Sequence, residues 1–74
     1  MTRAQCVSTA LNSSVLAAVA YATDGTLALR FRRGTVDCYF SVPPAVFQDL
    51  IAAPSKGAYF NRHIRDRFRH QRLT

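Results

Sequence analysis

The chain of 74 residues has two cysteines, four acidic residues and no long hydrophobic run. No segment approaches the roughly 20 apolar residues of a membrane-spanning helix, so we expect no membrane association. Cys6 and Cys38 form a single possible pair without CxxC spacing, which excludes a disulfide framework and favours reduced thiols in the cytoplasm. With 49% hydrophobic and 19% charged residues, the chain has the composition of one globular domain.

A short apolar run from Val15 to Ala22 leaves secretion open as an alternative. Arg3 precedes this run, and its last three residues, Ala20-Tyr21-Ala22, resemble the cleavage site of a signal peptide. However, polar residues at 12–14 interrupt the run upstream, and it is shorter than a normal hydrophobic region. Cleavage would also remove a strand that the rest of the chain needs. We therefore prefer a cytoplasmic location.

The sequence also lacks a paired acid and base, which argues against an enzyme. His63 and His70 are seven residues apart, too far for an i, i+4 metal pair on a helix. Cys38 is a candidate nucleophile, but the strand register predicted below buries it in the core, where thiols are inert. We therefore expect no catalytic residue, no metal and no cofactor.

Three runs rich in valine, alanine, leucine and aromatic residues predict an antiparallel β-meander that follows a loose N-terminal arm. Asp24-Gly25 and Arg33-Gly34 mark the two turns. At the first turn, a three-residue loop turns Val19 and Tyr21 toward the face of Leu29 and buries more carbon than a two-residue loop. The arm is expected at residues 1–12 and the strands at 14–21, 27–32 and 36–41.

At the second turn, a two-residue loop at Arg33-Gly34 sets which side chains share a face of the sheet. It places Cys38 opposite Leu29 on the inner face, and Arg30 opposite Asp37 on the outer face. The same register pairs Phe31 with Val36, Leu27 with Phe40 and Ala28 with Tyr39.

Two helices are predicted after the strands. Pro44 suits the first position of a helix that reaches about Ala52, and Pro54 stops it. Ser55 is a candidate N-cap for a second helix from Lys56 to Arg69. The apolar stripe of that helix repeats every fourth residue, at Phe60, Ile64 and Phe68, and must pack on the sheet. The predicted fold is α+β: a three-stranded antiparallel β-meander followed by two helices packed on one face, over residues 13–70, with a basic tail at 71–74.

The stretch from Val42 to Arg65 combines a Val-Pro pair, a Ser-x-Gly turn and a Phe-Asn pair before Ile64-Arg65. In this order the motifs resemble the KTSC domain, and the resemblance covers roughly residues 13–69. That small bacterial module occurs alone or at the C-terminus of some lysyl-tRNA synthetases, and the resemblance implies RNA as a candidate ligand. The family's Tyr-x-Tyr motif falls at Asp37-Cys38-Tyr39, so the first tyrosine of a two-base stacking platform is missing here.

Positive charge is concentrated in the second half of the chain, which has a formal net charge of +6 overall. Nine arginines and one lysine favour bidentate contacts with phosphates. Four arginines follow a three, four, three spacing, which at a helical period gathers them in one band opposite the apolar stripe. This arginine band consists of Arg62, Arg65, Arg69 and Arg72. Ser55-Lys56-Gly57 is either a helix start whose free backbone N–H groups could bind an anion, or a simple N-cap. The nucleic-acid-binding candidates are Lys56, Arg62, Arg65, Arg69 and Arg72.

A second candidate surface is the outer sheet face, with Arg30, Arg32 and Tyr39, which the predicted fold turns away from the arginine band. The band has three interpretations: a solvated helix face, a site for RNA or another polyanion, or a site for an acidic protein. The sheet edge offers a further site for a protein partner. The sequence thus favours a small basic binding module, either for RNA or for a protein partner.

Overall fold

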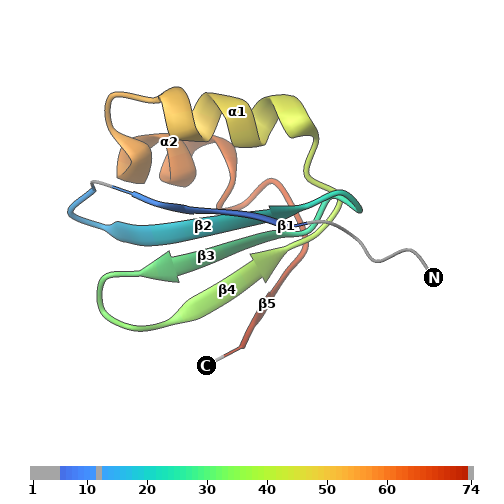
Figure 1. The fold of residues 1–74 in the computed structure, drawn as a ribbon, viewed down its shortest axis with the longest axis horizontal. Coiled ribbons are helices and arrows are strands. Elements are labelled where there is room, and N and C mark those ends of the chain that lie inside the picture. Colours follow the sequence, from blue (N-terminus) through green and yellow to red (C-terminus); the bar gives the residue numbers. More distant parts are fainter. Residues whose placement is uncertain (1–5, 12, 74) are drawn as a thin grey trace.

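The computed structural model describes residues 6–11 and 13–73, and within them the chain forms five strands and two helices. The strands make one antiparallel sheet in the order β1-β2-β3-β4-β5, so each strand pairs with its neighbour in sequence. Both helices lie on the same face of this sheet (Figure 1). The elements are β1 (Cys6–Ala10), β2 (Leu16–Ala22), β3 (Leu27–Phe31), β4 (Val36–Tyr39), α1 (Pro44–Ala52), α2 (Lys56–His63) and β5 (His70–Arg72).

The predicted α+β class is confirmed, but a three-stranded sheet is wrong because two further strands flank the meander. Cys6–Ala10, expected in a loose arm, pairs along β2 from Cys6 opposite Ala22 to Ala10 opposite Ala18. At the other edge, His70 and Arg72 pair with Tyr39 and Asp37, where we expected a helix end and a tail. Residues 1–5 and 74 of the expected arm and tail, and Asn12, lie outside the described residues.

The first hairpin has the three-residue loop that we preferred. The amide of Ala22 donates to the carbonyl of Thr26, and the amide of Gly25 donates to the carbonyl of Ala22. Val19 therefore lies opposite Leu29 and is buried with it in the core.

The second hairpin differs from the prediction by one residue. Its loop also has three residues, since the amide of Phe31 donates to the carbonyl of Thr35, and Gly34 takes a positive φ of 103°. Glycine suits that left-handed position because it has no Cβ. A slip of one residue turns every side chain of the strand to the other face, as β4 shows: Asp37 and Tyr39 point inward, whereas Cys38 leaves the core.

The two helix starts follow the prediction. Pro44 is the first residue of α1, and Ser55 caps α2 by accepting a hydrogen bond of 3.3 Å from the amide of Ala58. The predicted end of the second helix is wrong, because α2 stops at His63 and the chain turns over residues 64–67. The turn lets the last segment run back along β4, and the amide of Leu73 then donates to the carbonyl of Val36.

The core lies between the helices and the inner face of the sheet. Leu27, Leu29, Leu50 and Ile64 are fully buried there. Burying such large apolar side chains supplies most of the stabilisation that a small domain can reach. None of the helices in the described part of the chain is long and apolar enough to cross a membrane.

Candidate anion-binding cleft

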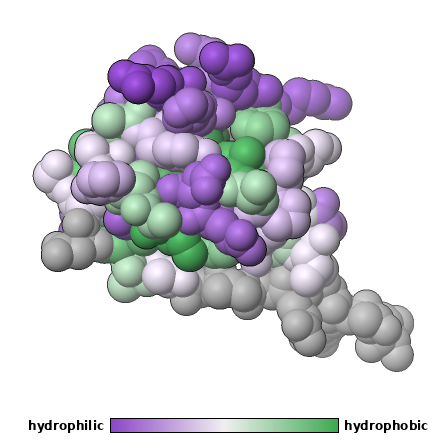
Figure 2. All heavy atoms as spheres, turned by 90° about the horizontal axis from the view of Figure 1, so that it is seen from above, coloured by the Kyte–Doolittle hydropathy of each residue, from purple (hydrophilic) through white to green (hydrophobic). Residues whose placement is uncertain are grey.

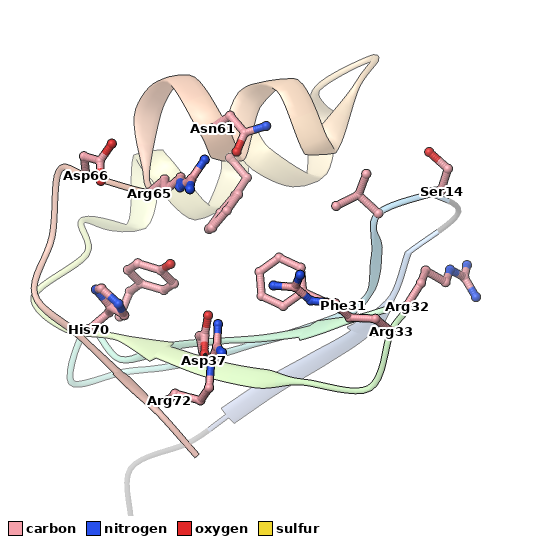
Figure 3. A pocket seen from close by; sticks show the side chains of 13 residues that line it. Ser14, Phe31, Arg32, Arg33, Asp37, Asn61, Arg65, Asp66, His70 and Arg72 are labelled. Atoms are coloured by element: carbon pink, nitrogen blue, oxygen red, sulfur yellow. Dashed lines mark hydrogen bonds and ion pairs between the residues drawn. The ribbon is translucent and has the colours of Figure 1, made fainter. Parts of the chain in front are cut away.

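A cleft of about 730 Å³ lies between the end of α2 and the inner face of β3, β4 and β5 (Figure 3). Figure 1 shows β5 farthest from the helices, so the helix layer leaves this side of the sheet accessible. Seen from above, hydrophilic side chains gather along the upper margin of the molecule and in a second group near its centre, and hydrophobic side chains lie between the two groups (Figure 2). The charged lining groups are Arg32, Arg33, Arg65, Arg72, Asp37 and Asp66, and the rings are Phe31, Tyr39, Phe60 and His70.

The second hairpin and the last strand place the polar groups of the cleft floor. Because of the three-residue loop, Asp37 points inward, and only 5% of it is exposed. Arg72 lies directly opposite on β5 and donates from Nε to Asp37 Oδ1 at 3.1 Å. The guanidinium itself is largely exposed, whereas the carboxylate is not. The ion pair therefore neutralises a buried acid and fastens β5 to β4.

Rings packed at right angles form the inner wall. Phe60 of α2 meets Phe31 edge-on at 5.3 Å between ring centroids, and meets Tyr39 in the same way at 5.7 Å. His70 stacks on Tyr39 with centroids 5.1 Å apart. The guanidinium of Arg33 lies 5.6 Å from the centroid of Phe31, within cation–π range. These contacts hold the rings in fixed positions at the edge of the core.

Burial and charge raise the pKa values of two groups of β4, Cys38 and Tyr39, which are both protonated at neutral pH. Burial raises the pKa of the Tyr39 hydroxyl, and the negative charge of Asp37 raises it further. Burial also raises the pKa of the Cys38 thiol, with the same contribution from Asp37. Cys38 is therefore not an activated nucleophile, although it lies outside the core. In the described part of the chain, no three histidine, cysteine or acidic side chains gather to bind a metal.

Two surfaces that we expected on opposite sides of the molecule meet in this cleft. Arg65 and Arg72 come from the predicted arginine band, and Arg32 and Tyr39 come from the second candidate surface. The band itself does not exist as one helix face, because α2 ends before Arg65.

The other four candidate residues, Lys56 among them, lie outside the cleft lining. Arg62 is exposed on α2 and Arg69 precedes β5, whereas Arg30 is exposed on β3, opposite Val36. Arg30 neighbours the inward-facing Leu29 and Phe31 along the strand and therefore points to the outer face.

Two candidate cations are already occupied by structural contacts. Lys56 donates to the carbonyl of Ala53 at 2.9 Å and so closes the turn between the helices. Arg32 donates to the carbonyls of Leu11 and Ser13, which fixes the connection from β1 to β2. These bonds use one of the three donors of Lys56 and two of the five donors of Arg32, and they restrain where the remaining donors point.

The sequence did not indicate Arg33, Asn61, Asp66 and His70 as lining residues, and the register predicted from it placed Asp37 on the wrong face. The glycine at position 34 was the available signal, because a three-residue hairpin loop commonly ends in a left-handed residue. Reading the loop in this way would have turned Asp37 and Tyr39 inward. The position of His70 had no comparable local signal.

Comparisons with known proteins agree with this architecture. The family model of the KTSC domain matches residues 12–68. A crystal structure of a KTSC domain protein from Yersinia pestis superposes with a TM-score of 0.87 at 25% identity, covering 95% of this chain and 100% of that one.

Two sequence relatives differ greatly in length. A protein of Tsukamurella paurometabola is 43% identical over 60 residues, which span 80% of this chain and 90% of the relative. A lysine–tRNA ligase of Nostoc punctiforme is 47% identical over 49 residues, which span 66% of this chain but only 9% of the ligase.

Proposed function

The chain belongs to the KTSC domain family, and on this premise we propose that it is an RNA-binding module that holds phosphates at the arginine-lined cleft. The observation that carries the proposal is that four arginines and four rings, drawn from separate segments, line one accessible cleft. The arginines outnumber the two aspartates of the lining by two charges, so the cleft attracts anions. One relative is named as a lysine–tRNA ligase, and for this reason we propose RNA as the polyanion.

Arg65 and Arg33 are the arginines best placed to bind phosphate. The side chain of Arg65 makes no hydrogen bond or ion pair with any described residue, and the side chain of Arg33 has one exposed hydrogen bond of 3.3 Å to Thr35. An arginine without a protein partner keeps its five donors for a ligand. The flanking Arg62 and Arg69 add charge outside the cleft and strengthen attraction at a distance.

The alternative is a protein-binding module that uses a sheet edge. β1 is an edge strand of five residues, and its outer side pairs with no other strand of the described residues. An extended partner segment could add to it through main-chain hydrogen bonds. Such binding depends weakly on salt, whereas arginine–phosphate contacts depend on it strongly. For either partner we propose binding rather than catalysis, in the cytoplasm.

Fluorescence anisotropy with a labelled RNA hairpin, a single-stranded RNA and a DNA duplex across a salt series tests the proposal. We expect RNA affinity to fall with a log–log slope of about −2 to −4, as expected for a few phosphate contacts. Arg65→Gln should weaken binding and reduce the magnitude of the slope by about 0.7 to 0.9. Arg30→Gln, the same change on the opposite sheet face, is the matched control.

Two results would contradict the proposal. If none of the three probes bound at low salt, the domain would not be a nucleic-acid-binding module. If Arg30→Gln weakened binding as much as Arg65→Gln does, the charge of the whole protein would attract the probe, and the cleft would have no special part.

A further inference from the structure

Two polar atoms in the cleft, the hydroxyl of Tyr39 and Oδ2 of Asp37, are not needed for phosphate binding and make no hydrogen bond with the described residues. Tyr39 is 2% exposed, and its hydroxyl makes no hydrogen bond within the described chain. Asp37 accepts one hydrogen bond, at Oδ1, which leaves Oδ2 unused. No fully buried side-chain oxygen or nitrogen of the described residues lacks a partner, so both oxygens must reach the surface of the cleft.

These two groups form a fixed hydrogen-bonding pattern. The Tyr39 hydroxyl is protonated at neutral pH, because its pKa is raised from an ordinary value of 10.0, so it can donate, whereas a carboxylate only accepts. Asp37 and Tyr39 are two residues apart on β4 and therefore face the same side. Buried polar groups of this kind discriminate strongly, because a ligand that does not satisfy them leaves them unpaired.

Among the nucleobases, guanine matches this pattern best. Its Watson–Crick edge offers two neighbouring donors, N1–H and the N2 amino group, beside the acceptor O6. Asp37 can accept both donors, at Oδ2 and at the remaining lone pair of Oδ1, while the Tyr39 hydroxyl donates to O6. Adenine, cytosine and uracil each offer one donor group on this edge, with an acceptor directly beside it, which a carboxylate repels.

The walls of the cleft suit a flat base with a phosphate attached. His70 and the pair of Phe31 and Arg33 are planar groups of the kind on which bases stack. Figure 3 shows Arg65 on the helix side of the cleft, with Asp37 and His70 on the sheet side. The volume of about 730 Å³ is that of a small-molecule site.

From this arrangement we infer that the cleft binds one unpaired guanine nucleotide of an RNA strand. Asp37 and Tyr39 read the Watson–Crick edge of the base, and Arg65 holds its phosphate. The inference rests on the RNA binding proposed above and adds a base preference to it. Guanine within a duplex is excluded, because pairing occupies the edge that Asp37 and Tyr39 contact.

The test compares short single-stranded RNAs that differ at one position. The probes are an oligouridine and three versions of it with a single central guanine, adenine or inosine, each titrated by anisotropy at one salt concentration. The guanine version should bind roughly tenfold more tightly than oligouridine, as expected for hydrogen bonds to a charged group. Inosine, which is guanosine without the amino group, should lose much of that gain, and adenine should show none.

Matched variants connect the preference to the cleft. Tyr39→Phe removes only the hydroxyl and keeps the ring contacts, so the guanine preference should fall severalfold in a folded protein. Tyr59→Phe is the control, because Tyr59 lies on α2 outside the cleft lining. Guanosine monophosphate should displace the bound RNA, whereas uridine monophosphate should not.

The outcomes separate this inference from the proposal on which it depends. If the four probes bind equally well and the salt series of the first experiment has the expected slope, RNA binding stands and the guanine site is refuted. If guanine is preferred but Tyr39→Phe keeps the full preference, the site is not this cleft. If an acidic peptide binds and no RNA does, the proposed function and the guanine site are both refuted.

Discussion

Truncating Phe60 to alanine should lower the free energy of unfolding by roughly 3 to 5 kcal/mol, the range for a buried phenylalanine. Phe60 is 6% exposed and meets both Phe31 and Tyr39 edge-on. Each aromatic pair adds about 0.5 to 1.5 kcal/mol to what burial alone gives, which favours the upper part of the range. A domain of 74 residues typically has a free energy of unfolding of about 4 to 11 kcal/mol. The variant should therefore keep only a small part of that free energy.

Urea titration followed by far-UV circular dichroism measures the effect. Phe60→Leu keeps most of the apolar volume but loses both edge contacts, and it should cost about 1 to 3 kcal/mol. Arg62→Ala, two residues later on the exposed side of α2, should change stability by at most about 0.5 kcal/mol. If Phe60→Ala cost less than about 1 kcal/mol, or no more than Arg62→Ala, Phe60 would not join the helix layer to the wall of the cleft.

Two further predictions concern β4 and β5. Arg72→Ala leaves the carboxylate of Asp37 buried without its cation, so we expect a loss of about 1 to 3 kcal/mol and faster hydrogen exchange at the amide of Leu73; unchanged exchange there would mean that the ion pair does not hold β5. The pKa values of Cys38 and Tyr39 are raised above their ordinary 9.0 and 10.0, so the unfolded chain loses these protons first as pH rises. Their contribution to stability should be complete below pH 9 and decline as the pH rises through the folded pKa values; urea midpoints that stay constant from pH 8 to 11 would contradict this.

The sequence by itself determined the features that depend on neighbouring residues. Gly25 and Gly34 marked the hairpins, and Pro44 and Ser55 marked the helix starts, because turns and caps are set by backbone geometry within a few residues. Alternation along residues 27–31 showed which face of β3 is buried. These local signals were enough for the fold class.

The facing of β4 depended on tertiary structure. Gly34 suits both a two-residue and a three-residue loop, because each has a position with positive φ. The two loops turn opposite sets of side chains inward. In the structure Tyr39 lies under Phe60, and Asp37 finds the cation of Arg72, which a residue on the other face could not reach. The observed register of β4 is therefore the one that allows contacts with residues distant in sequence, Phe60 and Arg72.

The end of α2 and the pairing of β5 were decided only by the tertiary structure. Neither glycine nor proline follows His63, so the repeat of Phe60, Ile64 and Phe68 continues the helical pattern through a segment that is not helical. The segment leaves the helix and pairs instead with β4, whose edge offers hydrogen-bonding groups such as the carbonyl of Val36. The amino-acid sequence determined that the second half of the chain is basic, and folding determined which of its arginines share a cleft with the rings.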